Sequence, residues 1–439
     1  MTSNKIKIVI ATNIFDIGGA ERTVQTLALY LDKSKFDVTV LCLERGGSRV
    51  KLLEEKGVRI LIGNGTLEKI KELIPNPDID ILHFHRSGQF EQLHQAATDY
   101  LHPKKLMETN VFAFSDPNLG PKFDLQIFKS MMMVSERIWQ GKQTEQNKCL
   151  KQRVVYNPVT INYFQQFQIS PERRQALRET VGVKSDEILL GRIGRNDPVK
   201  WGDLVLSALP DIFKINNKIK ILFRTIPASR LNWLKKHHFF DGRVIVLPES
   251  SSEQEIAETY QMLDIYIHTS RRGEAFGNSL NEAMVWSLPI VVENTPHWDN
   301  GQLEQVENGK TGWVVHSVGG LTAAVADLAG KPQHVEAFGK AGREKVEKSF
   351  GLPVGIRQYE LAYEQLAGIV PSSEVLKQIF PSAEMLLEYS KQYQKLSRLD
   401  FSHSQNISSE LRRKVLYWYW RVLDSLISRG FVKLKKQVP

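Results

Sequence analysis

The sequence predicts an α/β protein with two doubly wound parallel-sheet domains in series. Three observations support this prediction: a length of 439 residues, a globular composition (42% hydrophobic, 24% charged), and two series of short apolar runs separated by amphipathic stretches. A single hydrophobic core rarely serves so long a chain. Apolar runs that alternate with helical patterns are typical of βαβ units, whose helices cover both faces of a parallel sheet.

The expected strands fall into two groups on either side of a turn dipeptide at Asn157 and Pro158. The first group comprises residues 5–12, 37–43, 58–62 and 79–85. The second group comprises residues 187–194, 219–225, 243–248, 263–270 and 288–294. We therefore expect domains at 1–156 and 157–350, followed by helices at 351–370 and a basic helical extension at 371–439.

The net charge of +9 is concentrated near the C-terminus, because residues 410–439 carry eight basic and two acidic side chains. The rest of the chain is only mildly basic, and we expect no nucleic-acid partner. The segment 411–436 combines an apolar stripe with basic residues and the aromatic run from Tyr417 to Trp420. Two interpretations remain open: attachment to an anionic membrane surface, and docking on the protein's own surface.

Cysteine usage and the start of the chain predict a cytoplasmic location. Cys42 and Cys149 are the two cysteines of the sequence and cannot form a disulfide framework, which indicates a reducing compartment. The apolar run near the N-terminus is six residues long, too short for a secretory signal or a membrane span.

Ligands of open parallel sheets bind beyond the carboxyl ends of the strands, and four stretches lie there. In NIFDIGGAERT, Gly18 and Gly19 allow close approach of a ligand ahead of a helix start, although a structural turn explains the glycines equally well. In HFHRSG, His83 and His85 share one strand face, so either can point into a crevice or be a satisfied polar group. Neither a third ligand nor an HExxH pattern is nearby, so we expect no metal.

The other two stretches belong to the second domain. In GRIGRNDPVKWGD, Arg195 and Lys200 can converge on a diphosphate, the alternative being a solvated loop. In EAFGNSLNE, two carboxylates stand eight residues apart around a helix start. Glu274 can accept hydrogen bonds from sugar hydroxyls, and Glu282 suits a vicinal diol such as ribose, the alternative being a solvated helix face. The helix start also carries Phe276, Gly277 and Asn278, and its amides can face anionic oxygens.

Taken together, these motifs resemble the retaining GT-B glycosyltransferases of the family-4 type. The resemblance rests on GGAERT, HFH, VVYNPVT, GRIGRNDPVKWGD, EAFGNSLNEAM and VENGKTGWVV, and it covers about residues 5–370. It implies two Rossmann-like domains facing a cleft, with an acceptor-side first domain and a nucleotide-sugar-binding second domain. It also implies that the helices at 351–370 return to the first domain.

The resemblance implies a definite reaction and definite roles. A hexose or N-acetylhexosamine would move from a UDP-sugar or GDP-sugar donor to a glycan or lipid-linked acceptor, with no cofactor and no metal. Arg195 and Lys200 would neutralise the donor diphosphate, and the loop at Gly18 and Gly19 would close over it. Glu274 would hold the transferred sugar together with the amides of Phe276 and Gly277, and Glu282 would hold the ribose. His85, or else His83, would contact the reacting sugar.

Departures from the family pattern leave alternatives open. The chain has WSLP where the family has a small Ala-Gly pair before proline, Asn157–Pro158 where Asn-Gly is usual, and TPHWDN in place of a glycine-rich loop. A GT-B nucleotide-sugar epimerase or a non-catalytic nucleotide-sugar-binding scaffold would use the same cleft. Retention could proceed through a covalent carboxylate intermediate or by same-face attack, which the resemblance favours.

Overall fold

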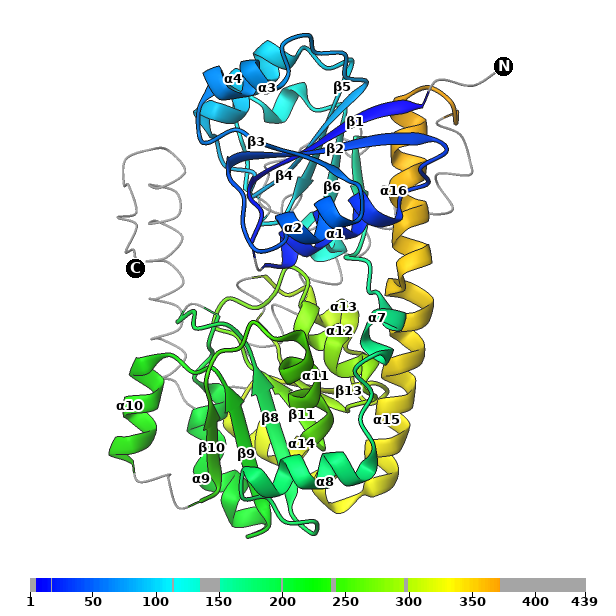
Figure 1. Ribbon diagram of the computed structural model, residues 1–439. Coiled ribbons are helices and arrows are strands. Elements are labelled where there is room, and N and C mark those ends of the chain that lie inside the picture. Colours follow the sequence, from blue (N-terminus) through cyan, green and yellow to red (C-terminus); the bar gives the residue numbers. More distant parts are fainter. Residues whose placement is uncertain are drawn as a thin grey trace.

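The computed structural model describes residues 5–371 apart from 17, 113, 135–150, 199, 238–241 and 296–298. The predicted extension at 371–439 lies outside the described residues except for Pro371. Within the described part, two parallel sheets are stacked along the molecule, each with helices on both faces (Figure 1). The predicted fold class is therefore confirmed for the two sheet domains.

The first sheet has seven parallel strands in the order β3-β2-β1-β4-β5-β6-β7. Its strands are β1 (Ile6–Ile14), β2 (Phe36–Arg45), β3 (Arg59–Ile62), β4 (Ile81–Arg86), β5 (Lys105–Asn110), β6 (Leu125–Phe128) and β7 (Gln152–Val154). Its helices are α1 (Gly19–Tyr30), α2 (Val50–Glu55), α3 (Leu67–Leu73), α4 (Gln92–Leu101) and the 3₁₀ turn η1 (Gly120–Lys122). β1 and β4 lie side by side at the centre although two strands separate them in sequence, so the chain reverses its winding between them.

The second sheet has six parallel strands in the order β10-β9-β8-β11-β12-β13. Its strands are β8 (Ile188–Ile193), β9 (Ile219–Arg224), β10 (Val244–Leu247), β11 (Ile265–His268), β12 (Ile290–Glu293) and β13 (Gly312–Val315). Its helices are α7 (Ile161–Gln165), α8 (Pro171–Thr180), α9 (Leu204–Ile215), α10 (Ala228–Lys236), α11 (Glu253–Met262), α12 (Asn278–Val285), α13 (Gln302–Gln305), α14 (Val318–Gly330) and α15 (Pro332–Lys345). Here the winding reverses between β8 and β11.

Both sheets are buried on two faces, which explains their nearly continuous apolar strands. Separate apolar clusters lie on the two faces of each sheet. The strands β1, β4, β8 and β11 end at the reversal points of the two sheets. In open α/β sheets these points are where ligands bind.

A long helical segment joins the two domains along one side of the molecule (Figure 1). After α15 the chain passes through a π-helical turn, η2 (Val346–Phe350), into α16 (Leu352–Leu366). Ile356, Tyr359 and Tyr363 of α16 are buried in the apolar cluster of the first sheet. At the junction Pro158 packs against Gly355, where a Cβ atom would lie 2.7 Å from the proline ring. The domain boundaries at 156/157, 350/351 and 370/371 stay predictions.

Candidate active site

A cavity of about 960 Å³ lies between the two domains. It is lined by residues at the ends of β1, β4, β8 and β11 and by the first turns of α1 and α12. The reversal points of both sheets therefore open onto one space. Of the residues predicted for a site, the cavity is lined by Gly18, Gly19, His85, Arg195, Lys200, Glu274, Phe276, Asn278 and Glu282.

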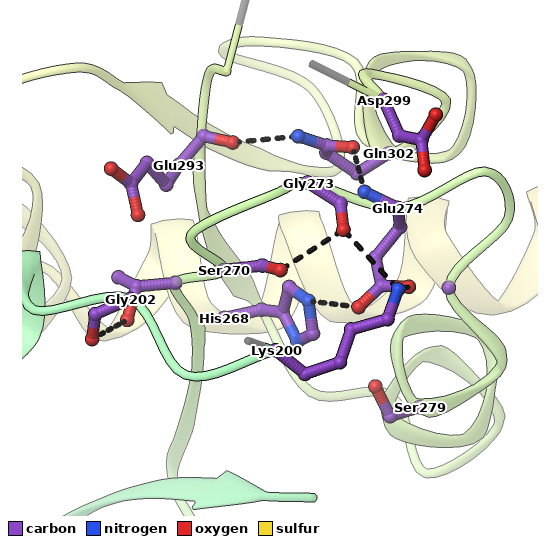
Figure 2. Close-up of polar contacts among 12 residues, drawn as sticks. Lys200, Gly202, His268, Ser270, Gly273, Glu274, Ser279, Glu293, Asp299 and Gln302 are labelled. Carbon is purple, nitrogen blue, oxygen red and sulfur yellow. Dashed lines mark hydrogen bonds and ion pairs between the residues drawn. The ribbon is translucent and has the colours of Figure 1, made fainter. Parts of the chain in front are cut away.

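Glu274 is the centre of a charged cluster on the second-domain wall (Figure 2). Lys200 Nζ lies 2.7 Å from one carboxylate oxygen, and His268 Nε2 lies 3.2 Å from the other. Burial alone would raise the pKa of the Glu274 carboxyl, but the Lys200 ammonium and the His268 imidazole hold it at about 2. Burial lowers the pKa of His268. The cluster therefore presents an ionised carboxylate paired with one cation near neutral pH.

The turn that carries Glu274 is fixed from behind by the loop after β12. The Glu274 amide donates to Gln302 Oε1 at 2.9 Å (Figure 2). The Gly301 amide donates to the Glu274 carbonyl at 2.7 Å. Gly273 has a φ of +63°, and a Cβ there would lie 1.6 Å from the Asp299 carbonyl oxygen. Only glycine allows this approach. The described residues of the unusual TPHWDN segment thus support the Glu274 turn.

Arg195 and the start of α12 are the second feature of this wall. The Arg195 side chain is exposed, and within the described residues it forms no ion pair. The amides of Asn278 and Ser279 open α12 without a hydrogen-bond partner in that same part of the chain. Gly277 differs from expectation, because its amide donates to Gln305 Oε1 at 2.9 Å and it does not line the cavity. The amides of this turn that remain available to an anion are therefore those of Asn278 and Ser279, not that of Gly277.

Glu282 is the fifth residue of α12, about one turn from its start, and it binds across the cleft. Arg22 of α1 donates to one carboxylate oxygen at 2.7 Å, and the Tyr260 hydroxyl donates to the other at 3.0 Å. Arg22 also lies 3.4 Å from Glu253. The carboxylate expected to face a ribose therefore has a partner on the first domain.

The loop at Gly18 and Gly19 brings the first domain close to α12. A Cβ at Gly19 would lie 2.7 Å from Asn278 Nδ2, so a larger residue would push the two domains apart there. Asn157 at the junction donates to Asn278 Oδ1 at 2.9 Å and accepts from Thr23 at 3.1 Å. These contacts tie the glycine loop, the junction and the start of α12 together.

The two histidines of β4 have different environments. His83 is enclosed, with Tyr363 Oη 2.6 Å from Nδ1 and Thr109 Oγ1 2.8 Å from Nε2. His85 lines the cavity, and both of its ring nitrogens are buried without a hydrogen-bond partner in the described part of the chain. Burial holds the pKa of His85 well below its usual range, so its ring is neutral near pH 7. His85 is therefore the histidine that can bind a ligand.

Sequence reasoning missed several polar residues of the cavity, among them Arg22 as a side chain, Lys129 and His268. His268 and Lys129 stand at the end of β11 and directly after β6, so the strand-end criterion could have identified both. The partner of Arg22 lies 260 residues away, and no local pattern indicates it.

The described residues also bear on metal binding and on membrane spanning. Among the described residues, no group of three or more His, Cys, Asp or Glu side chains could hold a metal ion. In the same part of the chain, none of the helices is both long enough and apolar enough to span a membrane.

Two parallel-sheet domains that face one cavity, with paired cations and carboxylates on the second-domain wall, define a GT-B architecture. HepE from Anabaena, solved in complex with UDP and glucose, has this fold; the two structures align with a TM-score of 0.64 and 18% identity over 81% of this chain and 99% of that one. Residues 173–345 match the family described as Glycosyl transferases group 1. This match covers the second domain, and together with the structural likeness it confirms the predicted resemblance to this family and the GT-B fold.

Two curated relatives match shorter stretches. The spore coat protein SA of Bacillus subtilis is 26% identical over 213 residues, which are 46% of this chain and 55% of the relative. The D-inositol 3-phosphate glycosyltransferase 2 of Catenulispora acidiphila is 25% identical over 182 residues, 39% of this chain and 42% of the relative. The chain thus matches about half the length of its curated relatives.

Proposed function

We propose that the protein is a retaining glycosyltransferase. It would transfer a hexose or N-acetylhexosamine from a UDP-sugar or GDP-sugar to a glycan or lipid-linked acceptor in polysaccharide or glycoconjugate biosynthesis. The observation that carries this proposal is the 2.7 Å pair between Lys200 and Glu274 in a cavity that Glu282 and His85 also line. In this pair, Lys200 would stabilise the leaving diphosphate and Glu274 would bind the sugar.

Departure of the nucleoside diphosphate is the step that needs most stabilisation, because the transition state is oxocarbenium-like. Arg195 lines the cavity without an ion pair in the described residues, and Lys200 is half-buried beside Glu274. Together with the amides of Asn278 and Ser279, they would carry the charge that develops on the diphosphate. We therefore expect the diphosphate to be bound by protein groups without a metal ion.

The remaining residues would orient the sugar. The ionised Glu274 carboxylate would accept hydrogen bonds from sugar hydroxyls, and Glu282 would accept from the ribose diol. The neutral His85 ring, with its two unpartnered nitrogens, would contact the reacting sugar. Because Lys200 and His268 hold both oxygens of Glu274, this carboxylate is poorly suited to nucleophilic attack. That supports same-face attack, with the donor phosphate accepting the acceptor's proton.

The direct test is an assay of the purified protein with UDP-glucose, UDP-N-acetylglucosamine and GDP-mannose, chosen after a thermal-shift screen. Transfer to an acceptor with retained anomeric configuration, read by proton NMR of the product, supports the proposal. Release of a free epimerised sugar would indicate an epimerase. Nucleotide binding without hydrolysis or transfer would indicate a non-catalytic scaffold.

We also propose a cytoplasmic location with reversible attachment to an anionic membrane surface through residues 411–436. The support is compositional, because these residues lie outside the described part of the chain. A lipid-linked acceptor would be reached from that surface.

A further inference from the structure

Lys129 is a buried lysine on the first-domain wall of the cavity, directly after β6. Its ammonium nitrogen donates a 2.7 Å hydrogen bond to the Tyr359 hydroxyl and lies 5.3 Å from the centre of that ring. A lysine ammonium has three N–H donors, and Tyr359 uses one of them. Within the described residues, two donors of this buried cation therefore remain for another partner.

The neighbouring cation Arg86 shows what a self-sufficient buried charge requires. Its guanidinium lies 2.7 Å from Glu108 and 2.9 Å from Asp116, and all three side chains are buried. Lys129 has no such carboxylate among the residues that the structure describes, and burial lowers the pKa of its ammonium to about 7. An uncompensated buried charge destabilises a protein unless a ligand supplies the missing partner.

His85 is a second side chain of this wall whose ring nitrogens have no hydrogen-bond partner among the described residues. The two side chains line the same cavity, and the Lys129 charge further lowers the pKa of His85. His83 on the same strand differs, because Thr109 and Tyr363 occupy both of its ring nitrogens. Lys129 and His85 thus both keep hydrogen-bonding capacity that no described residue uses.

We propose that Lys129 and His85 form a subsite for a single anionic group, a carboxylate or a phosphate, carried by the sugar substrate. This inference rests on the proposed glycosyltransferase function. The donor diphosphate is assigned to Arg195 and Lys200 on the second-domain wall, so the subsite binds a further anion. The substrates that fit are a uronic acid or phosphorylated sugar, either as the donor's sugar or as the acceptor.

Matched pairs of probes that differ in one anionic group separate these sources. The donor pair is UDP-glucuronate and UDP-glucose, and the acceptor pairs are octyl glucuronide with octyl glucoside and glucose 6-phosphate with glucose, measured with UDP present. Titration calorimetry of the wild-type protein should show at least about tenfold tighter binding of the anionic member in one pair. The pair that shows this preference identifies whether the anionic group belongs to the donor or to the acceptor.

Lys129→Met should abolish this preference, because it keeps the side-chain length and removes the charge. Lys105→Met is the matched control: Lys105 lies on the adjacent strand, half-exposed and paired with Asp124 at 3.0 Å outside the cavity. Equal binding of both members of every pair by the wild-type protein overturns the inference, and so does a preference that survives in Lys129→Met. Binding of UDP alone reports on the proposed function, since the diphosphate is common to both donors. Absence of binding of both UDP and GDP would refute both proposals.

A measurement on the wild-type protein covers the case in which Lys129→Met does not fold. The preference for the carboxylate member should decrease as pH rises from about 6 to 8.5, because Lys129 loses its proton in this range. His83 and His85 have pKa values well below it, and burial raises the pKa values of Tyr359 and Tyr363. The neighbouring Arg86 is paired with Glu108 and Asp116.

Glu304 lies near the backbone that carries Lys129, because it accepts hydrogen bonds from the amides of Met131 and Met132. Burial raises the pKa of Glu304 to about 7. The pH series is therefore repeated with Glu304→Gln. A preference that stays constant with pH in both proteins would count against the subsite.

Discussion

Arg22 in the first domain donates a 2.7 Å hydrogen bond to Glu282 in the second domain, and Tyr260 holds the other oxygen of that carboxylate. A ribose diol that binds Glu282 must share the carboxylate with Arg22 or displace it. We therefore expect nucleotide binding to be coupled to this contact between the domains. The two glutamates of the motif consequently do different work: Glu282 joins the domains, whereas Glu274 is held within one domain by Lys200.

We expect Glu282→Gln to weaken binding of bare UDP or GDP by about tenfold, because a charge-assisted hydrogen bond to the ribose is lost. Glu274→Gln should instead weaken binding of the nucleotide sugar more than that of the nucleotide. Calorimetry with UDP and UDP-glucose, or the GDP equivalents, measures both effects. Glu258→Gln, on α11 outside the cavity and paired with Arg173 of α8, is the control. Equal losses for both ligands in both variants would contradict the division of roles.

Lys200→Ala and Arg195→Ala should each lower kcat/KM for transfer by at least about a hundredfold, because each removes positive charge from the developing diphosphate. Lys200→Ala also leaves Glu274 buried without its cation, so its effect should be the larger of the two. Steady-state kinetics with a saturating acceptor provide the measurement, and Arg173→Ala serves as a surface control. Near-native kcat/KM in both variants would show that the phosphate site is assigned wrongly.

Glu304 should make stability depend on pH at the contact between the domains. Its carboxylate accepts from the amides of Met131 and Met132 and from the Tyr156 hydroxyl, and burial raises its pKa from 4.5 to about 7. A carboxyl whose pKa is raised on folding stabilises the protein below its unfolded pKa. This contribution is lost as pH rises through the folded value.

Relative to Glu304→Gln, which cannot ionise, the wild-type protein should lose about 2–3 kcal/mol of unfolding free energy between pH 4.5 and 7. Thermal unfolding of the two proteins across this range measures the difference. A constant gap between their Tm values would mean that Glu304 is ionised throughout.

Ser287→Gly should stabilise the protein by about 0.5–1 kcal/mol. Ser287 follows α12 with a φ of +55°, in the WSLP segment where the family resemblance leads us to expect glycine. Leu288 donates back to the Ala283 carbonyl at 3.1 Å, the hydrogen bond of a helix end that favours glycine. The same substitution at Ser207, an exposed position inside α9, should destabilise by about 0.5 kcal/mol. Denaturant unfolding that gives the same sign for both variants would refute the prediction.

Truncation after Ser409 should abolish binding to anionic vesicles and leave transfer to a soluble acceptor analogue largely intact. The residues removed carry a net charge of +6, and about 1 kcal/mol per basic residue near an anionic surface is ample for reversible attachment. Sedimentation with vesicles at low and high salt gives the measurement. If the truncated protein instead loses stability and activity, while the full chain fails to sediment with vesicles, the segment is a docked structural element.

The sequence was sufficient to predict most strands of both sheets, because buried parallel strands are short apolar runs that local pattern reveals. The strands that it did not predict are β5, β6, β7 and β13. β7 has three residues, and β5 reads KLMETN, so neither presents a sustained apolar run. The strand-end criterion also located nearly all the predicted cavity residues, since the ends of parallel strands meet at one edge.

What the sequence by itself determined is thus the fold, the strand ends at which ligands bind, and the spacing of Glu274 and Glu282 on one helix start, because all three follow from local periodicity. Only the tertiary structure decided which side chains are free. His83 and His85 share one face by the period of two, yet Tyr363, 280 residues from His83, encloses that histidine alone. Likewise, Arg22 acquires Glu282, and Lys129 is left without a carboxylate among the described residues. A side chain's partners depend on which distant segments pack against it, and no local pattern encodes that.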